Sequence, residues 1–136
     1  MATSNENAIV KQVEETKESG PKVGKLKPGD YTVHILIQQV KDINMDSDRT
    51  TDVVISASCS GQTKYTETMT GVTATTEANF QEHLFLELKN QSTEQLETSK
   101  VLIKICEKGS FKDAIIGITE FDFSFVYFMN HHTMYH

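Results

Sequence analysis

Two carboxylates near the middle of the chain have the type and spacing to bind a hard cation. Asp46 and Asp52 lie six residues apart, and Asp52 opens the β-branched run Val-Val-Ile, which predicts a strand. That strand would fix Asp52 at the rim of a β-sandwich, and the acidic loop would bring Asp46 back over it. Carboxylate oxygens are the ligands that Ca²⁺ prefers. The segment therefore predicts a calcium site, with a solvated acidic turn as the alternative.

An EF-hand does not explain the same segment. With Asp46 as position 1, the turn glycine of position 6 would be Thr51, and the bidentate glutamate of position 12 would be Ala57. Neither residue type can serve at its position, so the helix–loop–helix alternative is excluded.

The rest of the chain indicates no enzyme. The sequence has no nucleophile–base–acid order, no glycine-rich phosphate loop and no Cys/His metal spacing. His131, His132 and His136 would share a face only in a helical tail, and adjacent histidines near a terminus are more typical of polar surface. His34 is expected to be a surface or cross-strand histidine rather than a ligand.

Length and composition predict one sheet-rich domain. The 136 residues are 38% hydrophobic, with no Trp and many Val, Ile, Thr and Phe. Residues 1–29 carry five Lys against four Glu, and residues 30–136 carry eight basic against fifteen acidic residues. This acidic body argues against nucleic acid as a partner and against unaided attraction to anionic lipid. Cys59 and Cys106 predict reduced core thiols and, with no signal peptide or spanning run visible, a cytoplasmic location.

Turn signals divide the chain into a tail and a domain. Residues 1–27 are rich in Ser, Asn, Glu and Lys and predict a flexible tether, with at most a short helix around 8–17. Residues 28–136 form the domain, and 92–98 predicts a short capped helical turn within it. Strands are expected at 31–40, 52–59, 63–69, 79–88, 100–106 and 114–122. The expected core-facing residues are Tyr31, Val33, Ile35, Ile37, Phe80, Leu84, Leu86 and Leu88. The fold class is therefore all-β, an antiparallel β-sandwich with a short helical insert.

The pattern resembles a C2 domain. Asp46 and Asp52 match the acidic pair of that family's first loop, and Asp52-Val-Val-Ile stands where the family has Asp-Pro-Tyr-Val. Glu107 follows Ile103-Lys-Ile-Cys106, where the family runs from its sixth strand into the acids of the third loop. Gly117 after Ala-Ile-Ile matches a downstream glycine and is placed for a bulge or a close approach.

The chain is similar in more detail to the second C2 domain of ferlins, over roughly residues 25–136. The matching segments are Lys27-Pro-Gly-Asp-Tyr-Thr-Val, Ser60-Gly-Gln-Thr-Lys-Tyr-Thr66, Asp113-Ala-Ile-Ile-Gly117 and Phe125-Val-Tyr127. Ferlins are large, tail-anchored proteins with several C2 domains that act in membrane fusion and repair. The resemblance implies vesicle trafficking at the cytosolic face of a membrane, and phospholipid binding rather than a reaction.

The chain departs from the family in its ligand set and at its end. The third-loop Asp-x-Asp is represented by Glu107 and Gly109, which removes one acid, and Asp113 is four residues before Gly117 instead of three. The metal ligands implied are therefore Asp46, Asp52 and Glu107, with Asp48 or Asp113 in addition, and they predict weak or absent Ca²⁺ binding. The chain also stops about where the eighth strand of a C2 sandwich should begin. The last strand is thus expected to be missing, or to be supplied by a partner or by more chain.

Two apolar residues flank the acids and could contact a membrane. Met45 in the first loop and Phe111 in the third could insert into a bilayer interface once a cation neutralised the carboxylates around them. Alternatively, both side chains cap the sandwich. The overall expectation is a ferlin-like module for protein interaction and membrane-proximal recruitment, which binds other domains of the same or a larger protein and an anionic membrane surface. The alternative is a structural protein–protein docking module with no lipid or calcium role.

Overall fold

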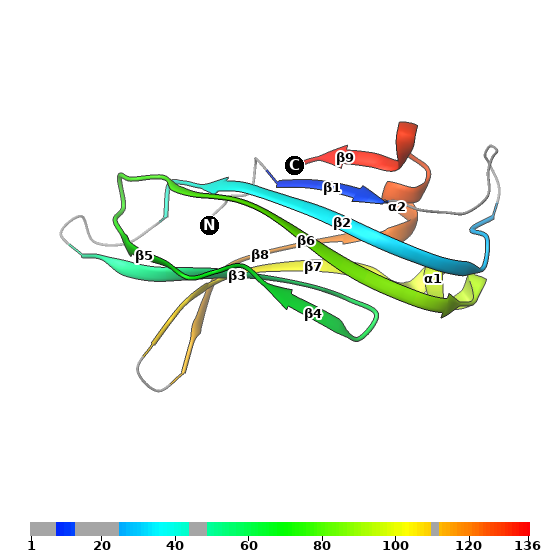
Figure 1. Cartoon of the computed structure of the whole chain (residues 1–136), viewed down its shortest axis with the longest axis horizontal. Helices are drawn as coiled ribbons and strands as arrows, with labels where there is room; N and C mark the ends of the chain where they lie inside the picture. The colour runs from blue at the N-terminus through cyan, green and yellow to red at the C-terminus, as the bar shows by residue number, and fades with distance from the viewer. Residues whose placement is uncertain (1–7, 13–24, 44–48, 110–111) are drawn as a thin grey trace.

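The computed structural model describes residues 8–12, 25–43, 49–109 and 112–136. Within these ranges the chain forms nine strands and three short helical segments (Figure 1). In chain order they are β1 (Ala8–Gln12), β2 (Gly29–Val40), β3 (Thr51–Cys59), β4 (Gln62–Tyr65), β5 (Met69–Val72), β6 (Ala78–Gln91), α1 (Thr93–Thr98), β7 (Lys100–Glu107), β8 (Ala114–Asp122), α2 (Phe123–Tyr127), η1 (Asn130–His132) and β9 (Thr133–Tyr135).

The strands form two antiparallel sheets that pack face to face. The first sheet has the order β6-β2-β1-β9, and the second has the order β4-β3-β7-β8 with β5 also paired to β3. Their inner faces bury one continuous apolar cluster. The predicted antiparallel β-sandwich is therefore confirmed.

The two longest strands bury the faces that their sequence pattern predicts. On β2, Tyr31, Val33, Ile35 and Ile37 are all buried, while the residues between them are half-exposed. On β6, the buried residues include Phe80, Leu84, Leu86 and Leu88. The period-two alternation is a reliable signal here because each strand has one face in the core and the other in solvent.

Two local predictions are confirmed by hydrogen bonds and register. The Ser92 hydroxyl accepts from the Gln95 N–H, and the Gln95 side chain accepts from the Ser92 N–H, so α1 begins with a capping box. Gly117 pairs with Ile105, but the next pair joins Cys106 to Ile115, which leaves one extra residue on β8. The expected bulge is therefore present beside Gly117.

The N-terminal expectation is wrong for residues 8–12. These residues were expected in a flexible tether with a short helix, but they form β1 between β2 and β9. Ile9 and Val10 are β-branched, and pairing on both edges outweighs the weak helical pattern. The remainder of the tether, residues 1–7 and 13–24, lies outside the described residues, and the boundary at 27 stays a prediction for them.

The expectation that the last strand is missing is also wrong, because β9 is present and pairs with β1. Before it, the aromatic segment Phe123–Tyr127 forms the short helix α2, whose Phe123 and Tyr127 rings pack edge-on against Tyr31. The chain then reverses at His131 and His132, which both have positive φ, and returns as β9. A three-residue strand carries too little alternation to be seen in the sequence.

The strand expected at 63–69 is divided into β4 and β5. The division occurs at Thr66, where the buried hydroxyl accepts from the Ile55 N–H at 3.0 Å in place of a backbone carbonyl. The Thr66 N–H still donates to the Ile55 carbonyl, and the hydroxyl donates to the Glu67 carbonyl. Since a side chain replaces one bond of the ladder, pairing stops and resumes at Met69.

Both cysteines are unpaired, but they lie in different environments. Cys59 is buried on the inner side, and burial raises the pKa of its thiol to about 11. Cys106 is half-buried on the outer side of β7, where burial and then the charge of Asp113 raise its pKa. The expectation that Cys106 is a core thiol is therefore wrong.

The cysteine environments predict an order of alkylation. In the native protein at pH 8, iodoacetamide should label Cys106 before Cys59, because the buried thiol is both less accessible and less ionised. Mass spectrometry of peptides at successive times measures the order, and labelling in urea provides the control in which both react. Equal native rates at the two sites would contradict the assigned burial.

Adjacent residues of β9 test the corrected end of the sandwich. Met134 is 7% exposed and Tyr135 is 75% exposed. Met134→Ala should therefore lower the free energy of unfolding by about 2 kcal/mol, whereas Tyr135→Ala should lower it by less than about 1 kcal/mol. Urea denaturation measures both. If Tyr135→Ala were the more damaging change, β9 would not have this register.

Candidate functional site

Strand register brings three of the five acids proposed as metal ligands to one rim. Val53 pairs with Glu107, and Glu107 pairs with Ala114, so Asp52, Glu107 and Asp113 meet at the same end of the second sheet. In Figure 1 this rim is at the left, where β3 and β8 begin and β7 ends. Asp46 and Asp48, the other two proposed ligands, lie outside the described residues, as do Met45 and Phe111.

Glu107 is the most enclosed of the three acids. Its side chain is 18% exposed, and its Oε2 accepts both from the Arg49 guanidinium and from the Thr51 hydroxyl, the latter at 2.6 Å. Arg49 is the one arginine in the sequence, and it lies in the acidic loop. The interaction places a permanent positive charge beside the carboxylate proposed for the third loop.

Asp52 is exposed, but both its side chain and its backbone connect β3 to neighbouring segments. Its Oδ1 accepts from the Gly71 N–H at 3.2 Å, and its carbonyl accepts from the Lys108 N–H at 2.9 Å. Gly71 has φ +70°, a conformation that favours glycine. Asp52 therefore holds β5 and the turn after β7 against the start of β3.

Asp113 closes the turn between β7 and β8. Its Oδ2 accepts from the Lys108 ammonium at 3.3 Å, and its Oδ1 accepts from the Gly109 N–H at 3.3 Å. A Cβ on Gly109 would lie 2.2 Å from the Lys112 carbonyl oxygen, so only glycine fits without moving the backbone. The close approach of the Lys112 backbone thus explains why glycine, rather than the second acid of Asp-x-Asp, stands at position 109.

The three carboxylates are accordingly already bound by the protein. Two cations, Arg49 and Lys108, face three carboxylates and leave one net negative charge among these five side chains. No group of three or more His, Cys, Asp or Glu in the described ranges is placed to hold a metal ion. A Ca²⁺ ion needs six to eight oxygens, so at these carboxylates it would compete with Arg49 and Lys108 and need further oxygen ligands from water or protein.

Sequence reasoning found the acids and missed their counter-ions. The acids are recognisable as oxygen ligands from residue type alone, and the sequence-based expectations give Arg49 no role. The sequence contains one indication of its role as a counter-ion, because a single arginine lies among three aspartates and arginine pairs readily with carboxylates. Which carboxylate it would contact depends on strand register, since Glu107 is 58 residues away.

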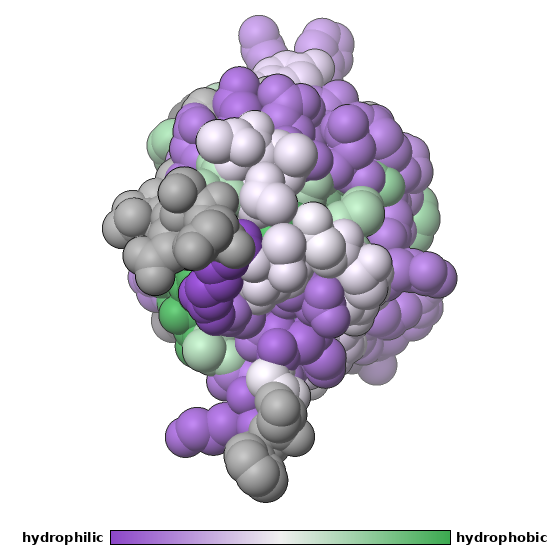
Figure 2. All heavy atoms as spheres, turned by 90° about the vertical axis from the view of Figure 1, so that its left-hand side faces the viewer, coloured by the Kyte–Doolittle hydropathy of each residue, from purple (hydrophilic) through white to green (hydrophobic). Residues whose placement is uncertain are grey.

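The surface of the rim is mainly polar. Figure 2 faces this end of the molecule and shows mostly hydrophilic and neutral residues, with hydrophobic colour only in small separate areas. None of the helices in the described part of the chain has the length and apolar character to cross a bilayer.

Comparison with known proteins identifies the fold. No protein-family model matches the chain, and no curated protein sequence matches it significantly. Among solved structures it is similar to the crystal structure of the RIM C2A domain from Drosophila, with a TM-score of 0.54 and 10% sequence identity over 86% of each chain. The chain therefore has a C2-type β-sandwich fold. The finer resemblance to the second ferlin C2 domain stays a prediction.

Removing the rim arginine tests the self-neutralised site. Arg49→Ala should raise the affinity for Ca²⁺, because it leaves the Glu107 carboxylate without its cation. Exposed ion pairs contribute about 0.2–1 kcal/mol, so the expected gain is roughly 1.5- to 5-fold. Isothermal titration with CaCl₂ measures it.

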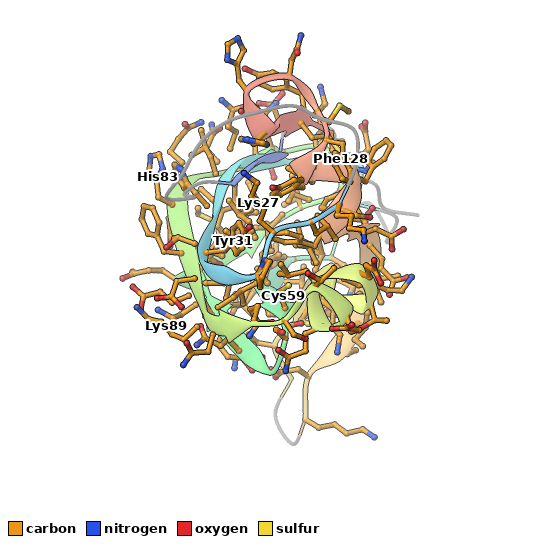
Figure 3. The ribbon with its side chains drawn as sticks, turned by 90° about the vertical axis from the view of Figure 1, so that its right-hand side faces the viewer. Lys27, Tyr31, Cys59, His83, Lys89 and Phe128 are labelled. Atoms are coloured by element: carbon orange, nitrogen blue, oxygen red, sulfur yellow. The ribbon has the colours of Figure 1, made fainter. Side chains whose placement is uncertain are left out.

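Lys89→Ala is the matched control for Arg49→Ala. It removes the same charge at the opposite end of the sandwich, where Lys89 is 4.0 Å from Glu87 (Figure 3). Lys89 is farther from the rim than the screening length of about 10 Å, because β6 extends from one end of the sandwich to the other (Figure 1). Calcium affinity should therefore not change. An equal response of the two variants, or no gain for Arg49→Ala, would contradict the role given to Arg49.

Proposed function

We propose that this chain is a non-catalytic C2-type module that brings a larger protein to protein and membrane-proximal partners, with weak or absent calcium dependence. The fold supports an interaction module, because its loops gather at the ends of a rigid sandwich where partners can be bound. The single observation that carries the calcium part of the proposal is the Arg49–Glu107 ion pair.

A calcium switch works by changing the charge of the rim. An empty rim of free carboxylates repels anionic lipid, and bound Ca²⁺ removes that repulsion and bridges to phosphate. Here Arg49 and Lys108 already cancel two of the three carboxylate charges that the structure describes. Calcium binding would therefore change the net charge of the rim less than in a rim of free carboxylates. This supports recruitment that depends little or not at all on calcium.

The overall charge favours protein contacts over lipid as the main source of affinity. The formal net charge is −6, so an anionic membrane would attract the module only through a local feature. We therefore propose that other domains of the same or a larger protein at the cytosolic face of a membrane are its principal partners. The resemblance to ferlins supports vesicle trafficking or fusion as the setting.

A second candidate function, a structural docking module without lipid or calcium, is favoured by the outer face of the second sheet. Ile118 pairs with Lys104, which pairs with Ser56, which pairs with Tyr65, so their side chains share that face. Ile118 is 55% exposed and Tyr65 is 66% exposed, and exposed large apolar side chains that share a sheet face are typical of protein interfaces.

Co-sedimentation with liposomes separates the two functions. The protein is mixed with phosphatidylcholine vesicles, with and without phosphatidylserine, in Ca²⁺ or in a calcium chelator. The leading proposal expects weak binding that differs by less than about 3-fold between the two conditions, because the rim charge is already largely cancelled. Binding to neither vesicle type would favour the docking module.

Asp52→Asn is the matching variant for this experiment. It keeps the shape and the acceptor oxygen that binds the Gly71 N–H, and it removes one rim charge. The proposal expects no change in sedimentation. Strong binding that requires calcium and disappears in Asp52→Asn would overturn calcium independence, whereas a strong calcium-dependent signal that survives Asp52→Asn would show that the ion binds elsewhere.

A further inference from the structure

Two histidines meet on the outer face of the first sheet, away from the rim acids. His34 lies on β2 opposite Phe85 of β6, and His83 lies on β6 opposite Leu36, so the two histidines are diagonal neighbours on adjacent strands. Val33 and Ile35 on either side of His34 and Leu84 beside His83 are buried, which directs both imidazoles away from the core. In Figure 3 the labelled His83 projects outward from β6.

The two rings meet edge to edge, with one ring nitrogen of each facing the other. The His34 Nε2 and the His83 Nδ1 are 2.6 Å apart, and the ring centroids are separated by 4.9 Å with an interplanar angle of 27°. The Phe85 ring stacks on His34 at 4.5 Å and 16°. Because both histidines extend from paired strands of a four-stranded sheet, their backbones are fixed relative to each other.

We propose that His34 and His83 form a two-nitrogen binding site for a borderline transition-metal dication such as Zn²⁺ or Cu²⁺. Imidazole nitrogens coordinate these ions at about 2.0–2.1 Å. Two such nitrogens are about 2.9 Å apart at a right angle and about 3.4 Å apart in a tetrahedron. From 2.6 Å, the pair needs to open by roughly 0.3–0.8 Å. Because the two nitrogens face each other, each imidazole must also rotate about its side-chain bonds so that both lone pairs point at the ion.

The ligand chemistry separates this site from the rim. Imidazole nitrogen suits zinc, copper and nickel, whereas calcium requires many oxygens. Metal binds to the neutral form of imidazole. The ion replaces the hydrogen bond between the rings, and water completes its coordination. The ring proton that formed that bond moves through solvent to the other nitrogen of its own imidazole, so that both rings stay neutral.

Zinc titration at pH 7.5 tests the site. ZnCl₂ is titrated into the protein in chelator-free buffer, in competition with a chromogenic zinc indicator. One Zn²⁺ per chain is expected, and excess CaCl₂ should not compete. His34→Asn and His83→Asn should each weaken binding by at least roughly 10-fold, because a single imidazole remains.

His131→Asn is the matched control, since the same substitution is made at an exposed histidine near the C-terminus. His131 has φ 56°, a backbone conformation that asparagine tolerates, so the variant should fold and keep full zinc affinity. The proposal is overturned if wild-type protein binds zinc no more tightly than His83→Asn, or if His131→Asn causes the same loss. Circular dichroism of each variant separates lost ligands from lost fold, and zinc-induced shifts of the imidazole C–H resonances in the wild-type protein provide a readout that requires no variant.

Discussion

The antiparallel register of β3, β7 and β8 is the constraint on which the rest of this structure depends. Val53, Glu107 and Ala114 form one row across the sheet, and this row places Asp52 and Asp113 beside Glu107. A shift of one residue in either pairing would turn every side chain to the opposite face and bury charge in the core. The buried residues that flank this row, such as Ile55 and Ile105, fix the register by their place in the apolar cluster.

The same register determines what the rim can do. It brings the acidic loop and its arginine to Glu107, and it brings Lys108 and Asp113 together across a tight turn. Oxygen ligands and counter-ions therefore arrive at one place from segments up to 58 residues apart. A rim built in this way keeps its shape through its own ion pairs and backbone hydrogen bonds, which suits a surface that binds partners in a fixed conformation. Exposed ion pairs are individually weak, so the neutralisation is adjustable and does not lock the rim permanently.

The sequence predicted the parts of the fold whose signals are local and long. The buried face of β2, the buried face of β6, the capping box at Ser92 and the bulge beside Gly117 were all readable from residue type and spacing. It failed where pairing partners decide the outcome. β1 has five residues and pairs with β2 and β9, and β9 has three residues and pairs with β1, so both are strands because of their pairing partners. The division between β4 and β5 depends on one hydroxyl, that of Thr66, which no alternation pattern reveals.

The candidate sites show the same limit. The rim acids could be predicted because aspartate and glutamate are recognisable as oxygen ligands from residue type alone. The contact of Arg49 with Glu107 depends on strand pairing, which the sequence does not reveal. His34 was expected to be a surface or cross-strand histidine, and the structure pairs it with His83, a residue 49 positions away. A ligand pair of that kind is a property of sheet register and cannot be read from spacing along the chain.

A calcium titration followed by NMR tests the self-neutralised rim most directly, through the backbone amides of Gly71, Lys108 and Gly109. These N–H groups donate to the rim carboxylates or to the Asp52 carbonyl and would move if calcium took over those oxygens. The account predicts no saturable shift of the three resonances below roughly millimolar calcium, well above the range of calcium sensors. Concerted, saturable shifts of all three at micromolar calcium would contradict it.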